Sequence, residues 1–311
     1  MCLQGTYLSD YYLRVAKSLQ IMEPKKPADI YKSQFETVIS SSSSSKDYIS
    51  STYVNAFVNA GFKEDSMVLT KDKNSNQSVI SSKGKSSVSI TAALGMVLMW
   101  SDSETSAEII LEYLSSENNT IKAGALLALG LNSVGLRQES DLTKALAGDY
   151  LEETSVSDSS ENQVKRAGLL SLGIAYAKTG DREVTEILTK FLHPEKRSIR
   201  TISFAALSLG LVHLGSGNAE VISILLDVLR EMRPQDLTHT YTRFIILGLA
   251  LTAMCRRDVV IFDSKSPNEE DAPTDITSTY INVTDLGDPV KMQAKVLVGA
   301  CSMAGSGEVL E

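Results

Sequence analysis

Apolar residues recur along this chain in blocks that contain one short sequence motif, and this motif closes on a glycine. The phrase is Ala/Leu-Ala/Ser-Leu-Gly, which occurs four times, followed by one shorter copy. Its marker glycines are Gly95, Gly130, Gly173, Gly210 and Gly248, and they are separated by 35, 43, 37 and 38 residues. A sixth copy near the end of the sequence has Ala300 at the marker position. A period of this length is typical of helical-hairpin repeats.

Each repeat holds two kinds of apolar pattern. The first is rich in Leu and small residues and is apolar nearly all round, as in Ala167–Ala177. The second follows a Gly or Asn turn and is amphipathic with helical spacing, as in Val184, Ile187, Leu188, Phe191 and Leu192. We therefore predict an all-α fold, an α-solenoid of helix-turn-helix repeats of about 35–43 residues with the first helix of each pair on the inside.

The marker glycines have two possible roles. A glycine inside a helix lowers stability by roughly 1 kcal/mol relative to alanine. Five glycines at the same position of successive repeats therefore indicate that tight packing offsets this loss. Alternatively, each glycine ends a short helix as a C-cap. Apolar residues continue beyond Gly173 and Gly210, which favours the packing role.

Composition divides the sequence into four segments. We expect an N-terminal helical segment (1–36), a Ser-rich linker (37–52), a transition helix around Tyr53–Phe62 followed by a polar loop (53–87), and the repeats (88–311). Within the repeats, residues 263–289 combine prolines with acidic residues. We interpret them as an exposed acidic loop insertion between the fifth and sixth units.

Charge and cysteine content exclude several classes of function. A formal net charge of −8 argues against a nucleic-acid binder. Cys2, Cys255 and Cys301 are too far apart in sequence for a Cys-rich metal site or a dense disulfide framework, so we expect a reduced, intracellular chain. The apolar runs are about twelve residues long, shorter than the ~20 that span a bilayer, and we expect no membrane association.

The histidines do not form a catalytic or metal-binding pattern. His193, His213 and His239 lie in three different repeat contexts without metal-ligand spacing. We interpret His213 as a packed or capping residue. No nucleophile and base pair is visible, so we predict a non-catalytic chain without cofactor or metal.

An acidic segment lies in the middle of the sequence. Between residues 139 and 161 the carboxylates are Glu139, Asp141, Asp149, Glu152, Glu153, Asp158 and Glu161, and one lysine, Lys144, lies among them. On the helix expected around Leu142–Leu151, Leu142 and Asp149 approach the apolar edge. The segment is either a solvated outer face or a docking surface for a partner with a basic rim and an apolar patch.

Several phrases carry a family resemblance. Ala123–Gly130 and Leu172–Gly180 resemble the proteasome/cyclosome repeat, which occurs in the two large non-ATPase subunits of the proteasome regulatory particle and in a subunit of the anaphase-promoting complex. The phrases outside the repeats are Gln20–Lys25, Asp29–Lys32, Val54–Phe62 and Thr240–Phe244. In this order they resemble the branch that serves as the ubiquitin-receptor scaffold beside the ATPase ring.

The resemblance implies a toroid of paired inner and outer helices. It implies proteasomal ATPase subunits, ubiquitin, ubiquitin-like domains of shuttle receptors and a deubiquitinase as partners, and a location in cytoplasm and nucleus. The family's ubiquitin site lies on outer helices that correspond here to Leu136–Leu151. The residues carried over are Glu139, Asp141, Leu142 and Asp149, with Glu152 and Glu153 nearby. The resemblance also implies that the chain is a fragment of such a subunit.

Two other hypotheses remain open at this point. The chain could be a generic α-solenoid adaptor of another large assembly, of the anaphase-promoting-complex or trafficking type, without ubiquitin binding. An enzyme is the third hypothesis, and His213 would be the residue to test for it.

Overall fold

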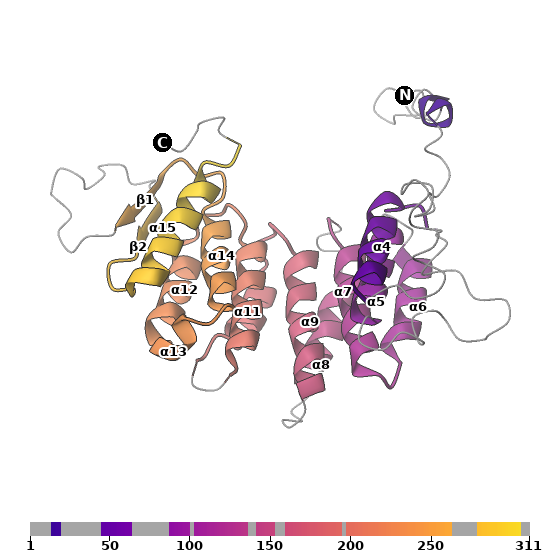
Figure 1. Cartoon of the computed structure of the whole chain (residues 1–311), viewed down its shortest axis with the longest axis horizontal. Helices are drawn as coiled ribbons and strands as arrows, with labels where there is room; N and C mark the ends of the chain where they lie inside the picture. The colour runs from indigo at the N-terminus through magenta and orange to yellow at the C-terminus, as the bar shows by residue number, and fades with distance from the viewer. Residues whose placement is uncertain are drawn as a thin grey trace. The chain divides into compact units, whose positions relative to one another are not determined.

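The computed structural model describes residues 14–19, 45–63, 87–99, 103–135, 141–152, 159–194, 197–262 and 279–305. These residues are mostly helical, which confirms the predicted all-α class (Figure 1). The helices of the first half are α4 (Ser45–Val58), α5 (Ser87–Val97), α6 (Ser103–Leu114), α7 (Asn119–Asn132), α8 (Asp141–Glu152) and α9 (Ser159–Ala175). The later elements are α10 (Arg182–Thr189), α11 (Ile199–Val212), α12 (Ala219–Glu231), α13 (Pro234–Leu237), α14 (Thr242–Thr252), β1 (Val259–Phe262), β2 (Thr279–Asn282) and α15 (Asp288–Ser302).

The chain divides into two compact units, Met1–Ala128 and Leu129–Glu311. In the second unit, helices α9, α11, α14 and α15 pack successively against one another and form an inner row. Helices α8, α10 and α12 form the outer row, and each packs on the inner helix that follows it. In the first unit, α5 packs against both α4 and α6.

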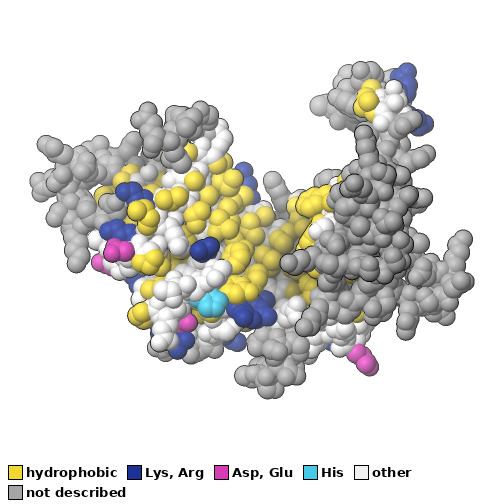
Figure 2. All heavy atoms as spheres, viewed as in Figure 1, with side chains coloured by type: hydrophobic (Ala, Val, Ile, Leu, Met, Phe, Trp, Pro, Cys, Tyr) yellow, Lys and Arg dark blue, Asp and Glu magenta, His cyan; other side chains and the backbone are white. Residues whose placement is uncertain are grey.

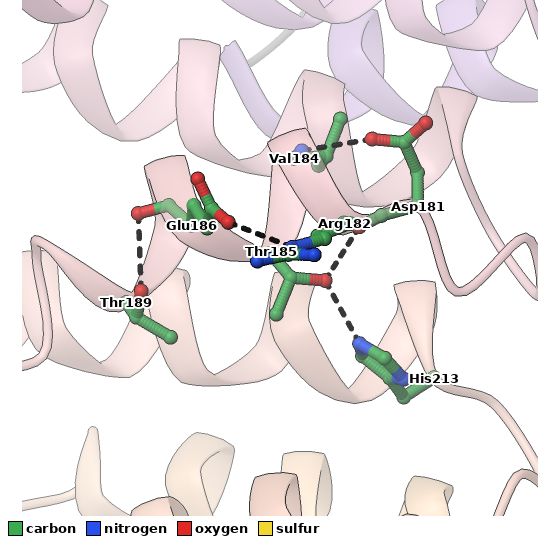
Figure 3. A network of polar contacts seen from close by, with 7 residues as sticks. All are labelled: Asp181, Arg182, Val184, Thr185, Glu186, Thr189 and His213. Atoms are coloured by element: carbon green, nitrogen blue, oxygen red, sulfur yellow. Dashed lines mark hydrogen bonds and ion pairs between the residues drawn. The ribbon is translucent and has the colours of Figure 1, made fainter.

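Outer helices are held by one apolar stripe each. On α10 the buried residues are Val184 and Leu188, and Figure 3 shows polar contacts of Asp181, Arg182, Thr185, Glu186 and Thr189 along the same helix. Asp181 begins this helix as its N-cap, because its carboxylate accepts a hydrogen bond of 2.9 Å from the Val184 amide. Asn218 caps α12 in the same way, through the amides of Glu220 and Val221.

All five marker glycines lie inside helices, and none lies beyond a last helical turn. A Cβ on Gly173 would come within 2.6 Å of the Ser208 Cα, and a Cβ on Gly210 within 2.5 Å of the Gly248 Cα. Comparable clashes with the backbone of the next inner helix would occur at Gly95 and Gly130, and at Gly248 with the preceding helix. The glycines therefore allow adjacent inner helices to touch through their backbones, and the C-cap alternative is wrong.

The turns after α9 and α11 each cap the next inner helix. The amides of Lys178 and Gly180 donate to the carbonyl oxygens of Leu211 and Val212, at 2.9 and 3.0 Å. One repeat later, the amides of Gly215 and Gly217 bond to Leu251 and Thr252, at 2.9 Å each. All four donors have positive φ, so these turns supply partners for carbonyl groups that a helix end leaves unsatisfied.

The structure corrects the expected boundary of the Ser-rich linker. Helix α4 begins at Ser45, inside the segment predicted as linker (37–52), and it ends at Val58. Its buried side carries Thr52, Asn55 and Ala56, which are at most 1% exposed. Polarity misled the sequence prediction because buried polar side chains here bond to one another, as Asn59 does to Asn55 at 2.9 Å. The polar loop of 64–86 lies outside the described residues.

The described end of the predicted acidic insertion, from residue 279 onward, is not an exposed loop. Strand β2 pairs in parallel with β1, with Val259 opposite Thr279 and Phe262 opposite Asn282. Ile281 and Val283 are fully buried in the core of the second unit, and α15 begins at Asp288. The alternation of apolar and polar residues from Tyr280 to Val283 was the sequence signal for this strand. Residues 263–278 lie outside the described part of the chain.

The inner-row packing gives a direct stability test. Gly210→Ala should lower the free energy of unfolding by at least about 2 kcal/mol, because the added methyl group overlaps the backbone of α14. Gly148→Ala is the matched control, since nothing lies within 4 Å of a Cβ on this glycine of α8. The control should stabilise the chain by about 0.5–1 kcal/mol. Urea unfolding midpoints measure both effects, and equal midpoints for the two variants would contradict the packing role.

Candidate functional site

Helix α8 carries the residues predicted for partner docking. It buries Thr143, Ala147 and Leu151, one residue per turn, on the side that packs against α9. A buried hydrogen bond of 2.7 Å between the hydroxyl groups of Ser133 and Thr143 fixes the start of the helix. Contacts on its inner side therefore hold the opposite side of α8 facing outward.

Two of the predicted site residues lie together on this outward side. Leu142 is 43% exposed, and Asp149, seven residues later and hence on the same helix face, is also exposed. Ala145 is exposed between them. We call Leu142, Ala145 and Asp149 the α8 outer stripe. The expectation that Leu142 and Asp149 approach the apolar edge was wrong, because Thr143, Ala147 and Leu151 form that edge instead.

The remaining predicted residues are placed less completely. Asp141 is the first residue of α8 and Glu152 is the last, and their side chains lie outside the described part of the structure. Glu139 and Glu153 lie wholly outside the described residues. The structure thus brings Leu142 and Asp149 together and leaves the other four as predictions from the sequence.

Lys144 changes the charge of this surface in a way that the sequence did not reveal. Its Nζ lies 2.6 Å from Glu183 Oε2, on the neighbouring outer helix α10. This ion pair neutralises the one lysine of α8, so it does not offset the carboxylate of Asp149. An exposed pair of this kind contributes at most about 1 kcal/mol to stability. Its main consequence is therefore electrostatic.

His213 lies in a polar network between the outer helix α10 and the end of the inner helix α11 (Figure 3). Its Nε2 is 2.9 Å from the Thr185 Oγ1, and that hydroxyl donates its proton to the Asp181 carbonyl oxygen at 2.6 Å. Because the hydroxyl has a single proton, the imidazole Nε2–H must be the donor to Oγ1. His213 is 6% exposed and its amide caps α11, as predicted for a packed or capping residue.

The described residues contain no group of three His, Cys, Asp or Glu side chains that could share a metal ion. Within the same part of the chain, no helix combines the length and apolar character needed to cross a membrane. The distinctive features of this region are an outward apolar and acidic stripe and a regular helical support.

The fold defines a class, the helical-repeat protein with glycine-packed inner helices. Comparison with known proteins makes this specific: residues 91–123 and 205–231 match the proteasome/cyclosome repeat, and residues 1–36 match the RPN1 N-terminal domain. The predicted resemblance to the proteasome/cyclosome-repeat family is therefore confirmed.

Relatives align along nearly the whole chain. It is 31% identical to the 26S proteasome regulatory subunit rpn-1 of Neurospora crassa, over 100% of this chain and 32% of the relative. It is 30% identical to the 26S proteasome regulatory subunit rpn1 of Schizosaccharomyces pombe, over 99% of this chain and 32% of the relative. The Arabidopsis thaliana 26S proteasome non-ATPase regulatory subunit 2 homolog A is 31% identical to it, over 99% of this chain and 33% of the relative. The chain thus spans about a third of the length of these curated relatives.

The buried histidine predicts a pH dependence of stability. Burial lowers the pKa of His213 below its ordinary value of 6.5, and a smaller effect of Glu220 opposes this shift. The unfolded chain therefore binds the proton more readily than the folded chain, so stability is complete above about pH 6.5 and falls as the pH drops through that value. Melting temperatures at about pH 7.5 and about pH 5.5 should show this loss.

The comparison needs two variants. His213→Gln should reduce the loss between the two pH values, whereas His193→Gln, at an exposed histidine, should leave it as in the parent chain. An identical pH response in parent and His213→Gln would show that another group is responsible.

Proposed function

We propose that this chain is part of a non-catalytic scaffold subunit of the proteasome regulatory particle, acting in ubiquitin-dependent protein degradation in cytoplasm and nucleus. Its partners in this proposal are proteasomal ATPase subunits, ubiquitin chains, ubiquitin-like domains of shuttle receptors and a deubiquitinase. The names of the relatives support the regulatory-subunit role. The helical-repeat architecture supports a scaffold, because stacked repeats present long surfaces while their stability depends on neighbouring repeats.

The α8 outer stripe is the observation that carries the docking part of the proposal. Leu142 exposes a large apolar side chain, and the carboxylate of Asp149 follows it on the same face. A partner with an apolar patch inside a basic rim fits such a surface, because the patch covers Leu142 while rim cations approach the carboxylate. Ubiquitin is the partner of this chemistry that the family resemblance implies.

The ion pair between Lys144 and Glu183 strengthens this interpretation. An unpaired lysine in the middle of α8 would repel a basic rim, but Glu183 holds this ammonium group at 2.6 Å. The outer helices thus combine to present a surface of one sign around Leu142. Charge of this kind mainly raises the association rate and orients the partner, whereas the apolar contact lowers the dissociation rate.

Substitutions on the stripe test the proposal. Leu142→Ala should weaken binding of a purified ubiquitin chain about tenfold, because it removes the apolar anchor. Asp149→Lys should weaken binding about fivefold at low salt and less at high salt, because it reverses an exposed charge. Fluorescence titration of the full chain measures both dissociation constants.

Matched controls lie on other helices of the same unit. Met292→Ala removes an exposed apolar side chain of α15, which is 64% exposed, and Glu231→Lys reverses an exposed charge at the end of α12. Both should bind as the parent chain does. Equal affinity of all four variants and the parent would remove the stripe from the docking site.

Co-purification separates this proposal from the adaptor hypothesis. A tagged copy of the chain, expressed in cells, should recover ATPase-ring subunits of the proteasome. Recovery of another assembly without these subunits would favour a generic α-solenoid adaptor.

A further inference from the structure

A cluster of arginine and aromatic side chains lies on three inner helices, in the middle of α9 and toward the beginnings of α11 and α14. Its members are Arg166 of α9, Arg200 and Phe204 of α11, Tyr241 immediately before α14, and Phe244 of α14. We call these five residues the arginine–aromatic patch. They come from three successive repeats, so the stacking of the inner row is what brings them together.

The aromatic rings form a continuous platform. Phe204 lies with its ring centroid 6.0 Å from Phe244 and 6.2 Å from Tyr241, and the Tyr241 and Phe244 centroids are 5.9 Å apart. The Arg200 guanidinium lies over the Tyr241 ring at 5.4 Å from its centroid. All three rings remain partly exposed, so the platform is accessible from outside the core.

The two arginines of the patch differ from others in the same unit. Arg182, Arg230, Arg233 and Arg256 each form an ion pair with a carboxylate. Among the described residues, neither Arg166 nor Arg200 has a carboxylate or hydrogen-bond acceptor as a partner.

The electrostatics of Arg166 reflect this arrangement. Partial burial lowers the pKa of Arg166, and the positive charge of Arg200 lowers it further, while Tyr241 opposes the shift. Arg166 is thus held partly desolvated beside a like charge, which is unfavourable without a counter-charge. An anionic partner would relieve this repulsion.

Figure 2 shows one face of the molecule, on which Lys and Arg side chains lie beside an apolar area. A guanidinium group binds carboxylates through two parallel hydrogen bonds, and the rings offer an apolar surface for the rest of a peptide. A nucleic acid fits less well, because the chain carries a formal net charge of −8 and would repel a continuous phosphate backbone.

We propose that the arginine–aromatic patch docks an acidic peptide segment of a partner protein, with Arg166 and Arg200 binding its carboxylates and the three rings supporting its backbone and apolar side chains. This surface lies on inner helices and selects for negative charge. It is therefore separate from the α8 outer stripe, and it does not rest on the ubiquitin proposal.

Fluorescence anisotropy of the full chain with a labelled, Glu-rich decapeptide tests this inference, with the Gln version of the peptide as reference. The parent chain should bind the Glu peptide and not the Gln peptide. Arg200→Gln should weaken binding several-fold, and Arg166→Gln/Arg200→Gln should weaken it by more than about tenfold. Arg182→Gln/Arg233→Gln removes the same net charge at exposed positions and should leave binding unchanged.

Several results would overturn the proposal. It fails if the parent chain does not bind the Glu peptide at low salt, or if the control double variant loses as much affinity as the patch variant. A single-stranded oligonucleotide of equal charge that binds more tightly, and is weakened by the same substitutions, would assign the patch to nucleic acid instead. Circular dichroism checks folding, and Arg200→Gln alone decides the outcome if the double variant unfolds, because Arg200 is exposed.

Discussion

Backbone contact between successive inner helices is the constraint on which the rest of this structure depends. Where Gly210 faces Gly248, no side chain of any size fits between the two helices. Such packing increases the number of dispersion contacts per residue, because interiors are close-packed and voids cost energy. It also explains why small residues and Leu dominate these helices. Aromatic side chains such as Phe204 and Tyr241 are found toward helix beginnings, away from the glycine contacts.

The same close approach determines how the repeats connect. A turn can donate to the end of the next inner helix only if the two helices lie side by side, as Lys178 and Gly180 do for Leu211 and Val212. Packing and capping therefore reinforce each other, and each repeat fixes the orientation of the next. Cys255 continues this pattern without a glycine, since it has a φ of 60° and donates to the Cys301 carbonyl at 3.0 Å.

Much of this fold was predictable because the repeat period is a local, recurring signal. The inner and outer helices, and the packing role of the glycines, followed from it. The start of α4 and strand β2 did not, because their burial depends on tertiary partners for residues such as Asn55 and Ile281. At the candidate site, helical spacing could place Leu142 and Asp149 on one face. The pairing of Lys144 with Glu183, 39 residues away, required the stacking of two outer helices.

Charge on the two rows of helices follows from how each row is supported. Outer helices pack through buried stripes of residues, so their outward positions can carry charge. A neighbouring outer helix can also neutralise a lysine by an ion pair, as Glu183 does for Lys144. The inner row has little room for side chains at its glycine contacts, and larger residues lie away from them. Stacking brings together Arg166, in the middle of α9, and Arg200, near the start of α11, without a described carboxylate between them. The two surfaces that we propose as docking sites therefore lie on different rows of one array, so partners of opposite charge would not compete for the same surface.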